Sequence, residues 1–410
     1  HQDVFFRNDE MLGKNLFALK DKKWRDMRTI LSPVFTGSKL RGLCELMSEC
    51  GSQTVTYYVQ KMKQQNNNNP LKVDIFDACT RFTNDVIAST AFGIKVNSLA
   101  DKNNEFFGVG QKVSSFSSWR LWLFNLPLFV KQAFNIKIFP EDVYKFFRQI
   151  VNETIRVRAE KNIIRHDMIH LLMEARKEQI KRTEASNGKV DNISASNNVL
   201  TNDDITAQGV IFFIAGFSNV ALAISMASYE MAVNPEIQKK AYAEITEVLK
   251  ANNGKIDYDV IKQMKYLEMI ISETLRKWSP VVVGDRVCNK AFKIETPNDG
   301  VINVEPGMTM NIPISGLHND PKYFPNPKKF DPERFNETNK LKINPYTYIP
   351  FGLGPRICIA NRFVLIETKI LLFHILKTFE IVTTDETPIP MVLEKGAVIK
   401  PKGDTYGLAF

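Results

Sequence analysis

The chain has 410 residues, of which 44% are hydrophobic and 24% are charged, a composition typical of a globular protein with a large core. The net charge is +9, but the basic residues are spread along the chain, so a nucleic-acid-binding protein is not expected. No run of eighteen apolar residues occurs, so no segment is expected to span a membrane. The five cysteines lack the spacing of a zinc site, and we expect reduced thiols facing the cytosol.

The first part of the chain is predicted to be helical. Helices are expected over residues 21–31, 38–65 and 73–92. In the first of them, Trp24 and Arg28 lie four residues apart and therefore on one helix face. Such a pair is commonly a surface arginine packed over a tryptophan. The planar guanidinium of an arginine can also pair with a carboxylate.

The segment 117–140 is aromatic and basic, and Pro127 interrupts it. It is either ordinary core or a surface that lies on a membrane. An amphipathic helix is predicted over 141–164. The following stretch, 177–198, is rich in Lys, Ser and Asn and predicts a mobile loop.

A single long helix is predicted over 201–233. Thr201 and Asp204 resemble a capping box at its start, and Pro235 follows its end. The middle of this segment is apolar on every side. Such a helix is buried, so we expect it to cross the core.

Two further helices are predicted, over 235–249 and 266–278. The second contains Glu273 and Arg276, which lie three residues apart on one helix face. Because apolar residues surround this pair in the sequence, we expect it to be buried. A buried ion pair needs hydrogen bonds from a third group, so a partner is expected elsewhere in the chain.

The last part of the chain is predicted to contain strands, a long loop and a helix. Short alternating runs and turns predict a small β-sheet over 281–309. The proline-rich stretch 318–335 predicts a long ordered loop. A helix is expected over 361–378, and short strands follow residue 383.

The most distinctive stretch is the loop before that helix, Pro350-Phe351-Gly352-Leu353-Gly354-Pro355-Arg356-Ile357-Cys358-Ile359-Ala360. Its glycines allow a tight turn and a close approach to a flat ligand. Loop N–H groups and the N-terminus of the following helix favour the thiolate form of Cys358. We interpret Cys358 as a metal ligand or a nucleophile, with Arg356 placed to pair with an anion. A buried cysteine beside a structural turn is the simpler alternative.

The pattern Phe-x-x-Gly-x-Arg-x-Cys-x-Ala resembles the haem-binding loop of the cytochrome P450 family, where Gly usually stands in place of Ala360. The resemblance implies that Cys358 is the axial thiolate on the iron of haem b. It also implies that Phe351 packs beside the sulfur. Partners of the haem propionates are implied at Trp24, Arg28, Arg286 and Arg356.

The resemblance extends to other motifs in the same order along the chain. Glu273, Arg276 and Arg334 resemble a structural triad of the family, which locks the loop that presents Cys358. The fold implied is mainly α with small β-sheets (α+β), formed by residues 1–410 as a single catalytic domain. The chain looks most like insect microsomal members. We expect it to be truncated at the N-terminus, without the membrane anchor, the first helices and most of the main sheet.

The activity implied is insertion of one oxygen atom from O2 into a lipophilic small molecule, such as a terpenoid, a fatty acid or a xenobiotic. NADPH enters only indirectly, through an NADPH-cytochrome reductase. The location implied is the cytosolic face of the endoplasmic reticulum membrane, where segment 117–140 would contact the membrane surface. The substrate pocket is expected to be lined by Phe212, Phe217, Val220, Val281 and Val282.

The long helix departs from the family at the residues that handle protons. Ala215 and Gly216 match the family, but Ser218 and Asn219 replace its acid and alcohol. Neither residue is a proton-transfer acid at neutral pH, although both can orient a water molecule. Three hypotheses follow: a monooxygenase whose relay uses ordered water, a haem-thiolate enzyme that uses hydroperoxides, or a non-catalytic protein that binds haem or a lipophile.

Overall fold

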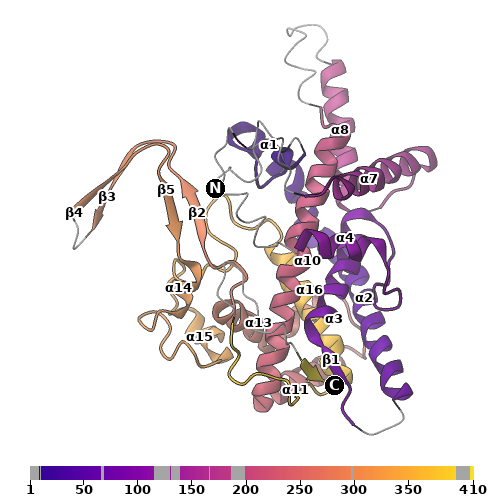
Figure 1. Cartoon of the computed structure of the whole chain (residues 1–410), viewed down its shortest axis with the longest axis vertical. Helices are drawn as coiled ribbons and strands as arrows, with labels where there is room; N and C mark the ends of the chain where they lie inside the picture. The colour runs from indigo at the N-terminus through magenta and orange to yellow at the C-terminus, as the bar shows by residue number, and fades with distance from the viewer. Residues whose placement is uncertain are drawn as a thin grey trace.

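Helix α10, Asn202–Val233, stands upright in the middle of the molecule (Figure 1). It begins at a capping box, in which Asp204 N donates to Thr201 Oγ1 over 3.1 Å and Thr201 N donates to Asp204 Oδ2 over 2.8 Å. It ends at Val233, because the proline at 235 disfavours a helical conformation in the residue before it. These bounds agree with the predicted helix over 201–233.

By length and composition alone, α10 could cross a membrane. However, 61% of its most apolar window is buried inside the fold, as in the core helix of a globular protein. The helix contributes residues to both hydrophobic clusters of the described chain. One contains Val220 and Ile224, and the other contains Phe213 and Phe217.

The computed structural model describes residues 9, 11–65, 69–114, 130, 139–165, 167–185, 199–296, 300–393 and 407–410. Most of these residues are helical, as predicted. The longer helices besides α10 are α1 (Asp21–Leu31), α2 (Gly37–Gln64), α3 (Ile75–Ile87), α4 (Glu105–Ser114), α7 (Glu141–Lys161), α8 (Met168–Ala185), α11 (Pro235–Ala251), α13 (Lys265–Lys277) and α16 (Asn361–Thr378). The short helical segments are η1 (Leu12–Lys14), η2 (Ser32–Phe35), η3 (Ala88–Phe92), α12 (Tyr258–Gln263), α14 (Ile314–Asn319), η4 (Pro332–Phe335) and α15 (Glu337–Lys340).

The strands form small antiparallel sheets, as expected over 281–309. Strand β2 (Gly284–Val287) pairs with β5 (Thr309–Ile312), and β3 (Phe292–Thr296) pairs with β4 (Gly300–Val304). These two strand pairs lie to one side of the helices (Figure 1). A third sheet has the order β1-β7-β6, from Lys72–Asp74, Gly407–Ala409 and Val382–Thr383. It ties the end of the described chain to the start of α3.

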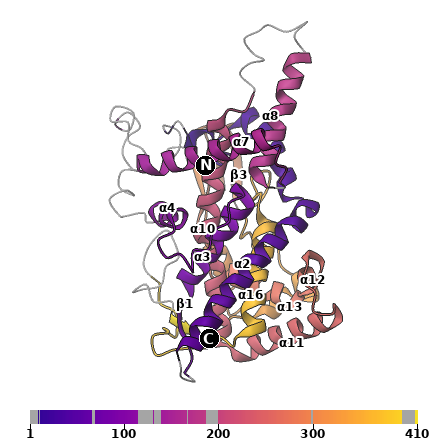
Figure 2. The same cartoon turned by 90° about the vertical axis from the view of Figure 1, so that its right-hand side faces the viewer.

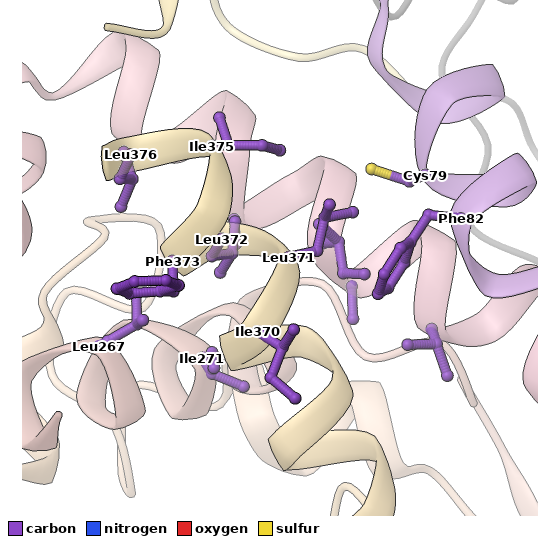
Figure 3. Packing of buried hydrophobic residues seen from close by; sticks show 14 of the residues in the cluster. Cys79, Phe82, Leu267, Ile271, Ile370, Leu371, Leu372, Phe373, Ile375 and Leu376 are labelled. Atoms are coloured by element: carbon purple, nitrogen blue, oxygen red, sulfur yellow. The ribbon is translucent and has the colours of Figure 1, made fainter. Parts of the chain in front are cut away.

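Helix α16 is packed between α2, α10 and α13. Figure 2 shows α2 running alongside it. Figure 3 shows that its apolar side chains point in several directions, with Phe373 near Leu267 of α13 and Leu371 near Phe82 of α3. All four of these side chains are at most 1% exposed. The helix that follows Cys358 is therefore anchored on several sides.

The structure corrects one predicted loop. Helix α8 continues to Ala185, so residues 177–185 are helical, and only 186–198 lie outside the described residues. Its first turns bury apolar side chains, and its polar end carries ion pairs of helical spacing, Lys177 with Glu174 and Arg182 with Glu178. The polar composition therefore reflects an exposed helix. Except for residues 130, 139 and 140, segment 117–140 also lies outside the described residues.

Candidate active site

The Cys358 loop folds back on itself just before α16. Gly352 and Gly354 adopt φ values of 75° and 77°, in the left-handed region that favours glycine. Ile357 N donates to Gly354 O over 3.0 Å, and Cys358 N donates to Phe351 O over 2.9 Å. These bonds hold the cysteine three residues before the first residue of α16.

Cys358 lines a cavity between α16 and α10. The cavity encloses about 630 Å³ of empty space, including its open mouth. Its walls are almost entirely apolar, and among the lining residues that the structure describes only Thr90 and Glu367 carry side-chain oxygen atoms. The full lining is Val34, Phe35, Leu43, Ile87, Thr90, Ala91, Met168, Phe212, Ala215, Gly216, Val220, Cys358, Ala360, Phe363, Val364 and Glu367.

Gly216 brings α10 close to α3 at this cavity. A Cβ atom at position 216 would lie 2.9 Å from the Ile87 Cδ1 atom, closer than two carbon atoms can pack without movement. The glycine therefore lets α10 and α3 approach more closely here than a larger residue would allow. Cys358 lines the same cavity from the α16 side.

The Cys358 sulfur is partly buried and forms no disulfide. Burial raises the pKa of the Cys358 thiol, whereas the backbone N–H of Ala360 and the charge of Arg28 lower it. Burial is the larger effect. The prediction that the loop by itself favours the thiolate is thus only partly right: the stabilising donors are present, but they do not outweigh the apolar surroundings.

Cationic side chains lie close to this loop. The Arg356 guanidinium lies over the Trp24 ring at 4.3 Å from its centroid, and its Nη2 donates to Leu19 O over 2.8 Å. Arg28, one helix turn after Trp24, is half-buried, and burial lowers its pKa while Cys358 raises it. The structure thus brings Trp24, Arg28 and Arg356 to one end of the cysteine loop. Arg286 lies on β2 and donates to Asp285 O over 2.7 Å.

Glu273, Arg276 and Arg334 form a buried cluster. Arg276 Nε and Nη2 donate to the two Glu273 oxygens over 2.7 and 2.8 Å, and both side chains are 0% exposed. Arg334 Nε approaches Glu273 Oε1 at 3.3 Å. Arg276 also donates to the carbonyl oxygens of His318 and Pro327 over 2.9 and 2.8 Å. The cluster therefore ties α13 to the proline-rich loop.

His318 carries this connection toward the cysteine loop, a role that the sequence reasoning missed. The Ile349 N–H donates to His318 Nε2 over 2.9 Å. Burial is the main cause that lowers the His318 pKa to about 4, so the ring is neutral and its Nε2 can accept this bond. Tyr348 adds a bond from its hydroxyl to Ser272 O over 3.0 Å. The position of His318, at the start of the proline-rich loop, was the only signal in the sequence.

The structure corrects part of the predicted substrate pocket. Phe212 and Val220 line the cavity, but Phe217, Val281 and Val282 do not. Phe217 lies on another face of α10 and packs against Phe213 and Phe107, with ring centroids 5.3 and 5.8 Å apart. Helical geometry explains this error, because residues 213 and 217 are separated by one turn and share a face that 212 and 216 do not. Val281 is 43% exposed, in the segment before β2.

Ser218 and Asn219 are not among the described lining residues of the cavity, whereas Ala215 and Gly216 are. The Asn219 side-chain N–H donates to Ala215 O within the same helix over 3.0 Å. This bond uses one N–H of the Asn219 amide, and the amide oxygen can still accept a hydrogen bond from water. Neither residue adds an acid to the cavity.

The decisive comparison is with protein families: the family model for cytochrome P450 matches residues 1–408. The chain belongs to the cytochrome P450 family. It is 42% identical to cytochrome P450 9e2 of Blattella germanica over 400 residues, covering 94% of this chain and 74% of the relative. It is 38% identical to cytochrome P450 9c1 of Drosophila melanogaster, over 94% of this chain and 74% of that one. It is 36% identical to cytochrome P450 6k1 of Blattella germanica, over 94% of this chain and 73% of the relative.

As a cytochrome P450, the protein is a haem-thiolate monooxygenase with haem b as its cofactor, and its electrons come from a reductase partner. The described site fits this cofactor. A cysteine thiol lines an apolar cavity, and thiolate sulfur is a suitable ligand for haem iron. Arginine side chains near the loop offer charge for the carboxylates of a haem.

Proposed function

We propose that this P450 inserts one oxygen atom from O2 into a lipophilic small molecule, with electrons from an NADPH-dependent reductase. The observation that carries the proposal is the cavity in which Cys358 and Gly216 both line the apolar walls. An almost wholly apolar lining favours a lipophilic ligand, because burial of apolar surface drives its binding. A xenobiotic would meet this requirement.

In this proposal, Cys358 is the axial ligand of the haem iron. Phe351 packs near the sulfur, and Trp24, Arg28, Arg286 and Arg356 serve the haem propionates. The geometry supports these roles unequally: Arg356 stacks on Trp24 and Arg28 interacts with Cys358, whereas Arg286 bonds to a neighbouring carbonyl. Glu273, Arg276 and Arg334 keep the loop in place through the bonds to His318 and Pro327.

A haem with an axial thiolate supplies the activation of dioxygen, because the sulfur donates electron density to the iron. The protein's own residues supply the surroundings. Gly216 lets α10 pack close to Ile87, and the apolar walls of the cavity disfavour water. Ala215 and Gly216 line the cavity from α10, while Ser218 and Asn219 would orient water close to it.

We further propose that the protein works on the cytosolic face of the endoplasmic reticulum membrane, next to its reductase. The aromatic and basic segment 117–140 supports contact with a membrane surface. The relatives named above support membership of the insect branch of the family.

The test combines a spectrum with turnover. We expect the reduced, CO-bound protein to show the absorption band of a thiolate-ligated haem, and Cys358→Ala to lack it. With purified reductase, NADPH and a panel of lipophilic compounds, we expect oxygenated product. A wild-type spectrum without the thiolate band would refute Cys358 ligation. If the wild type shows the thiolate band but forms no product in any assay, the result would favour a non-catalytic binding protein.

A second candidate, use of a hydroperoxide, is favoured by one observation. Ser218 and Asn219 replace an acid and an alcohol, and Asn219 already donates to Ala215 O. A hydroperoxide brings both oxygen atoms and the electrons, so it needs no net supply of protons. Product only with added hydroperoxide would support this candidate. If the reductase-driven reaction is right, replacing Ser218-Asn219 by Asp-Thr should raise the product formed per NADPH consumed.

A further inference from the structure

Gln208 of α10 is a buried amide that holds the segment before α1, residues 11–19, which we call the strap. Its side chain is 0% exposed. Its Oε1 accepts from Leu16 N over 2.8 Å, and its Nε2 donates to Lys14 O over 2.9 Å. The same Nε2 lies 3.2 Å from Asp204 O, one turn back in α10. One side chain therefore binds both a donor and an acceptor of the main chain of the strap.

The strap is folded on itself around Asn15, which lies between the two residues that Gln208 binds. Asn15 O accepts from Leu19 N over 3.0 Å. Its side-chain Oδ1 accepts from the N–H groups of Phe17 and Ala18, each over 2.9 Å. These bonds close a turn over four consecutive residues. The position of Leu19 is therefore fixed relative to the residues that Gln208 holds.

The strap ends against the cysteine loop. Leu19 O accepts from Arg356 Nη2 over 2.8 Å, and the Arg356 guanidinium lies over the Trp24 ring. Trp24 belongs to the first turn of α1, and its N–H donates to Lys20 O over 3.0 Å, directly after the strap. The contacts thus form a continuous chain from Gln208 on α10 to Arg356 in the cysteine loop.

The other end of the strap is held on α7. The Tyr144 hydroxyl donates to Asp9 Oδ2, and Asp9 Oδ1 accepts from Met11 N and Leu12 N over 3.1 and 2.9 Å. Asp9 is 9% exposed and Tyr144 is 3% exposed, so this anchor is buried. Because this end has its own anchor, loss of the Gln208 bonds should displace the strap near α1 without releasing it entirely.

The strap connects two walls of the Cys358 cavity from outside. Gln208 lies seven residues, or two helical turns, before Ala215, which lines the cavity from α10. Cys358 lines it from the other side, two residues after Arg356. No residue of the strap is among the described lining residues. The bonds of Gln208 therefore hold Arg356 in a fixed position relative to α10.

We propose that Gln208 is a positioning residue, which acts through the strap to hold the Arg356 guanidinium against a haem propionate. The inference rests on the proposed function, in which Arg356 serves a propionate. A guanidinium pairs with a carboxylate through a planar fork of donors, so its orientation decides the strength of the pair. Arginine carries several N–H donors, so Arg356 can bind Leu19 O and a propionate together.

The reduction potential of the iron should report the position of Arg356. Reduction adds one electron, and the negative charge of a propionate disfavours it, while a nearby cation compensates that charge. If the strap is displaced, Arg356 moves with Leu19 O and compensates the propionate less. Loss of the Gln208 bonds should therefore lower the potential.

Gln238 of α11 offers a matched control for Gln208. It is 5% exposed and also holds a distant segment by both ends of its amide. Its Oε1 accepts from Ile381 N over 2.8 Å, and its Nε2 donates to Ile381 O over 2.9 Å. Ile381 precedes β6, and no described residue of that strand lines the cavity. Gln238→Met should therefore lose the same kind of bonds without moving Arg356.

The first experiment compares Gln208→Met with Gln238→Met, since methionine is unbranched like glutamine and lacks its amide. The midpoint potentials of the haem-loaded proteins are measured without substrate or reductase. Gln208→Met should lower the equilibrium constant for reduction by on the order of threefold to tenfold relative to Gln238→Met. A tenfold change is about 59 mV for one electron. Equal potentials in the two variants would mean that Gln208 is only structural, which overturns the inference.

A double-mutant cycle tests whether Gln208 acts through Arg356. Arg356→Gln should lower the potential by itself, because it removes the cation. Added to Arg356→Gln, Gln208→Met should cause little further change, since there is no longer a guanidinium to position. Full additivity of the two shifts would overturn the inference, and so would an unchanged potential in Arg356→Gln.

The outcomes separate this inference from the proposed function. A wild type that shows the thiolate band but forms no product would refute only the proposed function, because the potentials are measured without turnover. A wild type without the band would refute both. If Gln208→Met does not retain haem, Gln208→Asn and Gln238→Asn replace the pair, since asparagine keeps the amide but is one methylene shorter. Equal potentials in that pair would overturn the inference.

Discussion

Replacement of Arg276 by lysine tests how the buried cluster supports the cysteine loop. Arg276 reaches both oxygens of Glu273 and two backbone carbonyls, at 2.7 to 2.9 Å. A lysine keeps the positive charge, but its single ammonium group cannot reproduce the planar fork of donors. At least one of these acceptors would lose its Arg276 donor in a site that is 0% exposed, although Glu273 Oε1 would keep the bond from Asp331 N at 3.0 Å.

The cost follows from those lost partners. Breaking a buried ion pair costs about 3–5 kcal/mol, and an unsatisfied buried carbonyl costs about 1–3 kcal/mol. Because lysine retains the charge, we expect a cost at the lower end of the ion-pair range. The free energy of unfolding should fall by about 3 kcal/mol. This is a large share of a typical stability of roughly 5–15 kcal/mol. Since Arg276 bonds to His318 O and His318 Nε2 accepts from Ile349 N, the haem site should also be disturbed.

The assay is urea unfolding of the haem-loaded protein, followed by circular dichroism and by haem absorbance. Arg156→Lys on α7 is the matched control, because Arg156 also contacts two glutamate side chains, Glu153 and Glu160, but is 57% exposed. We expect no measurable change in its unfolding midpoint. The reasoning would be refuted if Arg276→Lys were as stable as this control and kept the same reduced CO spectrum.

Three further predictions follow from the cavity. Gly216→Val should weaken the spectral response to lipophilic ligands, because a Cβ atom there already approaches Ile87 Cδ1 at 2.9 Å and the larger side chain would enter the cavity; unchanged ligand titrations would contradict this. Cys358→Ala should lose the thiolate band while the urea midpoint of the haem-free protein stays the same, since the side chain is only partly buried. Glu367→Gln should gain stability relative to the wild type as the pH rises. The folded wild type keeps a proton that the unfolded chain releases above the ordinary glutamate pKa, so its stability falls by up to about 1.4 kcal/mol per pH unit until the raised pKa is reached. Urea titrations at several pH values would measure this difference, and a constant difference would contradict it.

Local sequence signals predicted those elements whose ends are set by local chemistry. The capping box at Thr201 and the proline at 235 gave the bounds of α10, because these residues act within one helical turn. Turns and alternation predicted β-structure over 281–309, and the strands there form two antiparallel pairs. The end of α8 could not be predicted in this way. Its polar residues are satisfied as ion pairs on an exposed helix, and the same composition is typical of loops.

The sequence by itself determined the family, through the loop around Cys358 and the order of its other motifs, because a ligand and its supporting turn lie within a few consecutive residues. Tertiary structure decided which side chains share the cavity. Phe212 and Phe217 look alike in the sequence, but only Phe212 lines it, since the rotation of α10 sets the direction of each side chain. In the sequence, Glu367 is one charged residue of the predicted helix over 361–378. Only the packing of α16 shows that its carboxyl oxygens are buried without a hydrogen-bond partner among the described residues, and this burial raises the pKa of the carboxyl.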